Sequence, residues 1–237
     1  MDRGLVESRS RAQALIMAGL VYSKERKLEK AGQQVAGDIA LEVRGQDHPW
    51  VSRGGLKLAH AIQHFGIDPD GYVCIDVGAS TGGFTDVLLQ HGAACVYAVD
   101  VGHGQLAWKL RSDDRVQVLE KTNARYLSTE HVPEPVDLVV CDASFIGLRT
   151  VLPAAMTLTK DDARLIALIK PQFEAGREHV GKGGVVRDPD VHVSVCEDIR
   201  QWVQGAANWT VEGIVESPIT GPEGNVEFLI SAVKGEP

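Results

Sequence analysis

The 237-residue chain lacks the features that mark membrane-spanning, secreted or disulfide-rich proteins. No window approaches the roughly 18 consecutive apolar residues that a membrane-spanning helix needs. The first residues have neither the basic nor the apolar segment of a secretory signal peptide. The four cysteines show no C-x-x-C spacing, and three of them lie in apolar runs. We therefore expect a cytoplasmic protein with buried thiols, without disulfides and without a metal site.

Positive charge is also scarce. The chain has 24 Lys and Arg against 32 Asp and Glu, a net charge of −8, which argues against a nucleic-acid partner. The charges are unevenly distributed, however. Residues 1–57 contain 10 basic and 7 acidic side chains, whereas residues 58–237 contain 14 and 25. A slightly basic front end therefore precedes an acidic body, and a local basic surface remains compatible with the net charge.

The sequence divides into two regions of different pattern. Residues 1–45 predict a small α+β unit with a short helix, a β segment, a charged turn over 24–30 and a strand over 35–43. Residues 46–53 contain Gly, Pro and polar residues without a period and predict a linker. From residue 54 to 237, strand-like apolar runs alternate with helical segments, which is typical of a mostly parallel α/β sheet. These runs cover 72–77, 94–99, 116–119, 136–141 and 165–169, and two further runs, 209–216 and 226–233, predict an antiparallel hairpin at the end.

A glycine-rich turn follows the first of these strands, in the segment VCIDVGASTGGFT over 73–85. Glycines let a ligand approach the backbone closely, and the helix that opens after the turn offers free N–H donors. The turn lacks the G-x-G-x-x-G pattern of nicotinamide dinucleotide sites. It also places Asp76 at the strand end, where a carboxylate disfavours a pyrophosphate but suits a cation. A turn that only packs the helix onto the strand is the alternative.

S-adenosylmethionine carries a sulfonium and an α-ammonium group, and we therefore favour it over a dinucleotide. Asp100 ends the next strand, where an acid suits ribose hydroxyls. Asn123 follows the third strand, where its amide suits an adenine edge. The predicted cofactor-binding residues are Asp76, Gly78, Ala79, Ser80, Thr81, Gly82, Gly83, Phe84, Asp100 and Asn123.

Charged residues stand at other strand ends of the predicted sheet. Asp142 and Lys170 each follow an apolar strand, Glu227 begins the last strand, and Lys57 lies in the helix before the first one. Taken singly, each has an ordinary explanation, as a solvated charge or, for Asp142, as a helix cap. Ligands of an open parallel sheet bind beyond the carboxyl ends of its strands. Together, the four residues place two cations and two carboxylates at one sheet edge, next to the predicted methyl donor.

These four residues match, in order and context, the Lys-Asp-Lys-Glu tetrad of FtsJ-like RNA 2′-O-methyltransferases. The chain more closely resembles the TlyA-type, hemolysin-A-like ribosomal RNA methyltransferases, over nearly its whole length. The motifs that carry the resemblance are VSRGGLKL (51–58), DVGASTGGFT (76–85), AVDVG (98–102), KPQFE (170–174), GKGGVVRDP (181–189) and GPEGNVEF (221–228).

The resemblance implies a Rossmann-like S-adenosylmethionine methyltransferase fold and methylation of a ribose 2′-hydroxyl in ribosomal RNA. The implied catalytic residues are Lys57, Asp142, Lys170 and Glu227, with the Lys170 ammonium stabilising charge on the attacking oxygen. The implied partners are ribosomal RNA or ribosomal subunits, with neither a membrane nor a metal. Phe145 and Phe173 follow catalytic positions and suit either stacking on a flipped base or core packing.

The resemblance further implies that residues 1–45 are an RNA-binding module like that of small ribosomal protein four. Such modules usually begin about ten residues earlier, with a basic helix. We therefore expect either a misassigned start codon or a module without most of its first helix. The predicted RNA-binding residues are Arg9, Arg11, Lys24, Arg26, Lys27, Arg53, Lys182 and Arg187.

Two functions of other classes remain as alternatives. One is a non-catalytic RNA-binding protein that retains a methyltransferase fold, against which the complete tetrad speaks. The other is a membrane-active haemolysin. The net charge of −8 and the lack of a basic amphipathic helix make the second alternative poor.

Overall fold

The computed structural model describes residues 5–6, 9–17, 20–24, 26–28, 30–37, 39–43 and 48–235. The side chain of Arg11, one of the predicted RNA contacts, lies outside the described residues. The chain forms two compact units, Met1–Pro49 and Trp50–Pro237. Within the described part of the chain, no helix combines the length and apolar character needed to cross a membrane.

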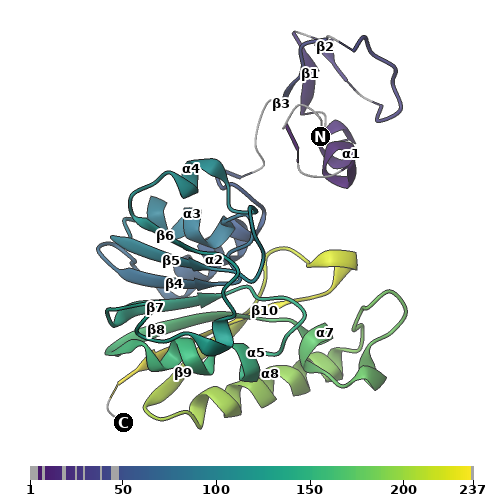
Figure 1. Cartoon of the computed structure of the whole chain (residues 1–237). Helices are drawn as coiled ribbons and strands as arrows, with labels where there is room; N and C mark the ends of the chain where they lie inside the picture. Colours follow the sequence, from purple (N-terminus) through teal and green to yellow (C-terminus); the bar gives the residue numbers. More distant parts are fainter. Residues whose placement is uncertain are drawn as a thin grey trace. The chain divides into compact units, whose positions relative to one another are not determined.

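The first unit packs one helix on a small sheet (Figure 1). Helix α1 covers Arg9–Met17, and strands β1 (Val21–Ser23), β2 (Arg26–Lys27) and β3 (Glu42–Val43) form an antiparallel sheet in the order β2-β1-β3. Leu15, Val21 and Leu28 make its small core. The charged segment 24–30 thus contains a short strand as well as a turn, and the strand predicted over 35–43 is confined to its last two residues.

The second unit is built on a seven-stranded sheet with the order β6-β5-β4-β7-β8-β10-β9. Its strands are β4 (Val73–Val77), β5 (Cys95–Val99), β6 (Val116–Leu119), β7 (Val136–Cys141), β8 (Thr159–Ile169), β9 (Trp209–Glu216) and β10 (Phe228–Lys234). Strand β10 runs antiparallel to both β8 and β9, and the pairs among β4 to β8 are parallel. The predicted α/β fold with an antiparallel C-terminal strand is confirmed.

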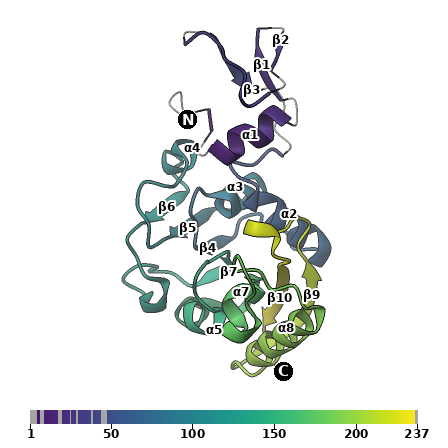
Figure 2. The same ribbon diagram turned by 90° about the vertical axis from the view of Figure 1, so that its right-hand side faces the viewer.

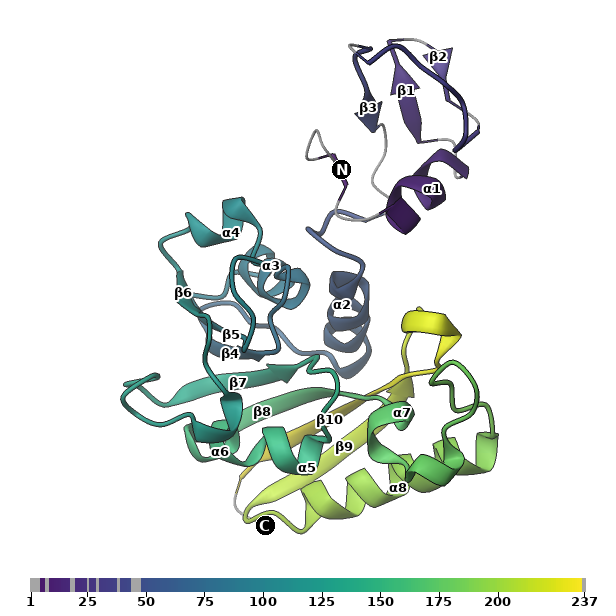
Figure 3. The ribbon, with the colours of Figure 1, turned by 45° about the vertical axis from the view of Figure 1, so that its right-hand side comes forward.

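Helices cover both faces of this sheet (Figure 3). Helices α2 (Gly54–Phe65), α3 (Gly83–Gln90) and α4 (Trp108–Arg111) contribute to the apolar cluster on one face. Helices α5 (Leu148–Val151), α6 (Pro153–Thr157) and α8 (Pro189–Gln204) contribute to the cluster on the other. Helix α8 packs against β9 and β10 (Figure 2). The short helices are α7 (Pro171–Glu174), η1 (Ala124–Tyr126), η2 (Arg177–His179) and η3 (Pro222–Gly224).

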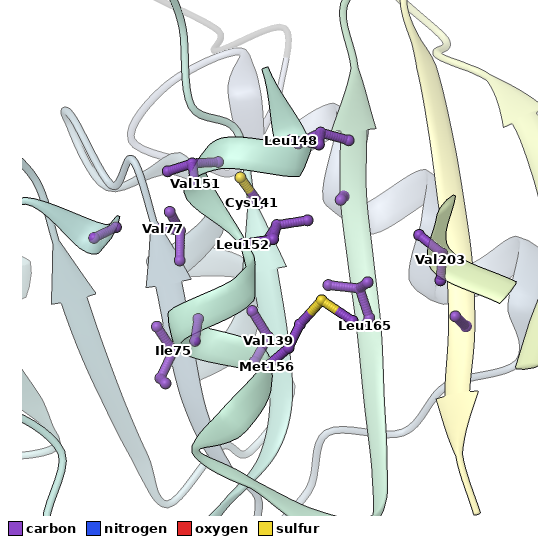
Figure 4. Close-up of a cluster of buried hydrophobic side chains, with 14 of the residues drawn as sticks. Ile75, Val77, Val139, Cys141, Leu148, Val151, Leu152, Met156, Leu165 and Val203 are labelled. Carbon is purple, nitrogen blue, oxygen red and sulfur yellow. The ribbon is translucent and has the colours of Figure 1, made fainter. Parts of the chain in front are cut away.

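Side chains alternate between the two apolar clusters, because successive strand residues point to opposite faces. Ile75 and Val77 of β4 lie with Val139 and Cys141 of β7 under α5 and α6 (Figure 4). The intervening residues of the same strands face α2 and α3. All four cysteines are free thiols, of which Cys74 and Cys141 are buried. Both faces of β4 and β7 are therefore buried, which explains the continuous apolar runs of these strands.

Residues 50–53, assigned to a linker from the sequence, pack against helices of the second unit. The Val51 N–H donates to Asp86 Oδ2 at 2.7 Å, which ties the segment to α3. The Trp50 side chain lies so close to Gly55 that a Cβ at that glycine would overlap the indole ring. The indole also stacks on His91, with ring centroids 6.0 Å apart. The second unit therefore fixes the path of the chain into α2.

A buried asparagine joins two loops whose motifs stand about 40 residues apart in the sequence. Asn225 Oδ1 accepts from the Val186 N–H at 3.1 Å, and Asn225 Nδ2 donates to the Gly184 carbonyl at 3.1 Å. The side chain is 3% exposed. Val186 is buried as well, so the amide of Asn225 satisfies a backbone N–H to which water has little access.

Replacing Asn225 with Ala should therefore destabilise the protein. The variant leaves the buried Val186 N–H unpaired, at a cost of about 1–3 kcal/mol in the free energy of unfolding. Urea denaturation followed by circular dichroism measures this loss. Gln63→Ala, at an exposed position of α2, is the control and should change stability by less than about 0.5 kcal/mol. Equal stability of the two variants would contradict the bridging role of Asn225.

Candidate active site

A pocket of about 240 Å³ opens where the order of the parallel strands reverses, at β4 and β7. Loops that follow adjacent strands diverge at this point, which is where open α/β sheets bind ligands. Four parts of the second unit supply its walls: the start of α2, the glycine-rich turn, the ends of β7 and β8, and the loop before β10. The lining residues are Ser52, Arg53, Gly54, Lys57, Gly78, Ala79, Ser80, Thr81, Gly83, Phe84, Asp142, Ser144, Lys170, Ile219, Thr220 and Gly221.

The four predicted catalytic residues meet in one chain of alternating charges. Lys57 Nζ lies 2.6 Å from Glu227 Oε2 and 3.8 Å from Asp142 Oδ2. The other oxygen of Asp142, Oδ1, lies 2.6 Å from Lys170 Nζ. Lys57, Lys170 and Glu227 are 7%, 5% and 1% exposed. Because the two positive and two negative charges are paired, they can be buried together.

Strand geometry explains why these residues meet. Asp142 directly follows β7, and its N–H donates to the carbonyl of Val77 at the end of β4. Lys170 directly follows β8. Glu227 precedes β10, whose first residue, Phe228, pairs with the last residue of β8. The antiparallel direction of β10 thus brings its beginning to the edge where the parallel strands end.

The Lys170 ammonium has a further partner that the sequence patterns did not single out. In addition to the Asp142 carboxylate, it donates to the Asp142 carbonyl at 3.1 Å and to Ser144 Oγ at 2.8 Å. Ser144 is exposed and lines the pocket. No periodic or compositional signal identifies such a residue, because its contact depends on the path of one loop.

Two glycines of the glycine-rich turn are required by close packing against the protein itself. Gly78 has φ +83°, and a Cβ there would lie 2.8 Å from Ala143 Cα, so only glycine fits. Gly82 also has positive φ, and a Cβ there would overlap the Leu110 side chain. Six of the predicted cofactor-binding residues line the pocket: Gly78, Ala79, Ser80, Thr81, Gly83 and Phe84.

Asp76 lies beneath this turn and does not line the pocket. Its Oδ2 accepts from Thr85 N at 2.9 Å and from Thr85 Oγ1 at 2.7 Å, at the start of α3. Its Oδ1 is buried and has no hydrogen-bond partner among the described residues. Burial raises the pKa of Asp76 to about 7, against the opposing effect of the Thr85 hydrogen bonds. Asp76 can therefore act on a ligand in the pocket only through electrostatic interaction at a distance, without direct contact.

Asp100 and Asn123 also lie outside the pocket lining. The Asp100 carboxylate accepts from the N–H groups of Ser80 at 2.8 Å and Gly102 at 2.6 Å, which joins the loops after β4 and β5. Asn123 Oδ1 accepts from the backbone N–H of Arg125 at 3.1 Å and caps η1. Both residues thus position loops at this edge, and their proposed contacts with ribose and adenine remain predictions.

An aromatic pair stands beside the catalytic residues. Phe145 is 90% exposed and has φ +65°, and its ring lies 5.1 Å from that of Phe173. The exposure excludes core packing for Phe145.

A carboxylate anchors the loop that carries Phe145. Glu174 Oε1 accepts from the Leu148 N–H at 2.7 Å, at the end of this loop. Burial raises the pKa of Glu174. Sequence reasoning missed this anchor.

The described basic side chains predicted to contact RNA are exposed in both units. Arg9, Lys24, Arg26 and Lys27 are exposed in the first unit. Arg53, Lys182 and Arg187 are exposed in the second, where Arg53 also lines the pocket.

Comparison with known proteins agrees with this geometry. Residues 50–234 match the family model described as FtsJ-like methyltransferase. The chain is 48% identical to "16S/23S rRNA (cytidine-2'-O)-methyltransferase TlyA" of Mycobacterium tuberculosis, over 96% of this chain and 85% of that protein. It is 40% identical to "Hemolysin A" of Brachyspira hyodysenteriae, over 96% and 95% of the two chains.

A solved structure described as "Putative hemolysin from Streptococcus thermophilus" superposes with a TM-score of 0.81 and 42% identity, covering 99% of this chain and 86% of that one. The family match spans most of the chain and includes the whole pocket. The protein therefore belongs to the FtsJ-like methyltransferase family.

Proposed function

We propose that the protein transfers a methyl group from S-adenosylmethionine to a ribose 2′-hydroxyl of ribosomal RNA. The observation that carries this proposal is the chain Glu227–Lys57–Asp142–Lys170, which ends with Lys170 at the wall of a pocket formed by the glycine-rich turn. The name of the relative from Mycobacterium tuberculosis supports the same reaction and substrate. A ribosomal RNA substrate also favours action in the cytoplasm.

The residues of the pocket fit the cofactor. The glycine-rich turn lines the pocket with small residues, Gly78, Ala79, Ser80 and Gly83, which leave room for a ligand beside the backbone. The unpartnered Oδ1 of Asp76 lies beneath the turn, where a bound cation would favour the ionised form of this carboxyl. We propose that residues 78–84 hold the cofactor, with Asp100 and Asn123 on its ribose and adenine sides. When bound, S-adenosylmethionine supplies a methyl group activated by its sulfonium.

Lys170 is the residue that we propose acts on the substrate oxygen. A ribose hydroxyl is a weak nucleophile while it keeps its proton, and negative charge develops on its oxygen as this proton passes to solvent. A fixed ammonium beside this oxygen lowers the free energy of that charge, more strongly in a site from which water is largely excluded. Asp142 holds the Lys170 ammonium at 2.6 Å, Lys57 lies 3.8 Å from Asp142, and Glu227 holds Lys57 at 2.6 Å. These three residues thus orient Lys170 and neutralise its surroundings.

RNA binding is assigned to the exposed basic residues and to the first unit, which we propose is an RNA-binding module. Phosphate contacts from Arg53, Lys182 and Arg187 would hold RNA near the pocket without reading its sequence. Phe145 exposes an aromatic face beside Lys170, as stacking on an unpaired base requires. With a net charge of −8, binding to naked RNA should be weak and salt-sensitive. The shape of a ribosomal particle would then supply much of the recognition.

Lys170→Ala should reduce methyl transfer to ribosomal subunits by about 1000-fold or more, because it removes the charge that faces the developing anion. Binding of S-adenosylmethionine should stay within about threefold of wild type, a difference below 1 kcal/mol. Labelled methyl donor measures the transfer, and mass spectrometry of the RNA locates the 2′-O-methyl group. Lys160→Ala removes a lysine paired with Asp137 at the opposite edge of the sheet and is the control. Near-normal transfer by Lys170→Ala would refute the assignment.

Affinity for S-adenosylmethionine should depend on pH through Asp76. The pKa of Asp76 is about 7 in the free protein, and a bound cation should lower it. Binding should therefore release protons near pH 7 and weaken as the pH falls below 7, by at most about tenfold per pH unit. Calorimetry in buffers of different ionisation enthalpy measures both effects. Asp76→Asn should bind without this pH dependence, and equal wild-type affinity at pH 6 and pH 8 would contradict the expectation.

Phe145→Ala should lower kcat/KM for the ribosomal substrate by about tenfold, since base stacking on an aromatic ring contributes about 1–3 kcal/mol. Phe145→Trp keeps an aromatic face and should retain most of the activity. Val193→Ala, which removes an exposed apolar side chain from α8, is the control. Steady-state kinetics on ribosomal subunits checks all three variants. An unchanged kcat/KM in Phe145→Ala would leave the ring without a role in substrate binding.

A further inference from the structure

We propose that Ser144 is a positioning residue whose hydroxyl occupies, on Lys170, the place that the substrate hydroxyl takes. The inference rests on the proposed function, because it concerns how Lys170 reaches the ribose oxygen. It starts from the contacts of the Lys170 ammonium in the described part of the chain. Ser144 is exposed, lines the pocket and lies 2.8 Å from this ammonium.

Oxygen atoms surround the ammonium of Lys170. A lysine ammonium carries three N–H donors and no acceptor. Lys170 Nζ donates to the Asp142 carbonyl at 3.1 Å and to Ser144 Oγ at 2.8 Å, and it forms an ion pair with Asp142 Oδ1 at 2.6 Å. A substrate hydroxyl that approaches Lys170 therefore competes with these oxygens for the ammonium.

Ser144 is the acceptor that can be replaced most easily. The Asp142 carboxylate is charged, and an ionic hydrogen bond is roughly twice as strong as a neutral one. The Asp142 carbonyl belongs to backbone that is fixed to β4 by the bond from Asp142 N–H to Val77. Ser144 offers a neutral hydroxyl on an exposed loop, so water can satisfy it once it leaves Lys170.

The ribose hydroxyl can replace the Ser144 hydroxyl on Lys170 without loss of a hydrogen bond. A serine hydroxyl and a ribose hydroxyl each have one donor and two acceptor lone pairs. Replacing one by the other on Lys170 exchanges one hydrogen bond for another, without a change in proton count. In the absence of substrate, Ser144 keeps one N–H of the ammonium directed to the pocket side. The same contact competes with the substrate, so it should raise the KM for RNA and have little effect on the step after binding.

Two variants at Ser144 test the inference through the separate responses of KM and kcat. Ser144→Ala removes the competing hydroxyl and should lower the KM for ribosomal substrate by about three- to tenfold, the effect of one modest hydrogen bond. Its kcat should stay within about threefold of wild type, since Lys170 and Asp142 remain. Ser144→Thr keeps the hydroxyl and should retain the wild-type KM. Ser112→Ala removes an exposed serine that bonds the Trp108 carbonyl and is the control.

A purely structural role for Ser144 would give a different result. Loss of a structural hydrogen bond lowers the melting temperature or kcat and does not lower the KM. A KM in Ser144→Ala that is unchanged or raised, with active wild-type enzyme, would overturn this inference alone. A wild-type protein that transfers no methyl group to ribosomal RNA would overturn the proposed function and this inference with it.

Discussion

The site depends on one carboxylate that faces two ammonium groups. Asp142 lies 2.6 Å from Lys170 and 3.8 Å from Lys57, and Lys57 in turn meets the buried Glu227. Removal of any one member would leave an uncompensated buried charge, which is far more costly than the loss of an exposed ion pair. The four groups must therefore arrive together, from the ends of β7 and β8, the beginning of β10 and the first turns of α2. The C-terminal strand β10 returns antiparallel beside β8 and thereby brings Glu227 to the edge where the parallel strands end.

Acidic residues stand at both ends of the sheet in the second unit. Parallel strands place their amino ends at the edge opposite the pocket, and the segments that begin these strands contain Asp68, Asp70, Asp113, Asp114, Asp161 and Asp162. On the pocket side, Asp142 and Glu227 are paired with Lys57 and Lys170. Arg53 lines the pocket, and Asn225 ties the loop carrying Lys182 and Arg187 to the loop before Glu227. These exposed basic residues, more than the net charge of −8, would determine how a polyanion meets the pocket side.

The sequence predicted the sheet and the ends of its strands, because apolar runs of strand length carry a strong local signal. That signal also predicted that Asp142 and Lys170 share an edge. The polar beginning of β8 was missed, since residues 159–164 have no apolar run. Thr159 and Arg164 pair with Val136 and Leu138 of β7, on either side of a register shift. The contacts of Ser144 with Lys170 and of Glu174 with Leu148 were missed for a different reason. Each joins residues 26 positions apart through the path of a loop, which leaves no periodic pattern in the sequence.

Asp76 shows how one residue can serve both the fold and the ligand. The sequence predicted that this carboxylate faces a cation, and the structure places it one layer below the turn, where it receives two hydrogen bonds from Thr85. Burial raises its pKa to about 7 although the Thr85 hydrogen bonds lower it, so the neutral form of the carboxyl is favoured more than in water. Its Oδ1 stays without a partner among the described residues. A positive charge above the turn would stabilise the ionised form. The Asp76 carboxylate, which fixes the start of α3, would thus gain a further electrostatic interaction when a cationic ligand binds.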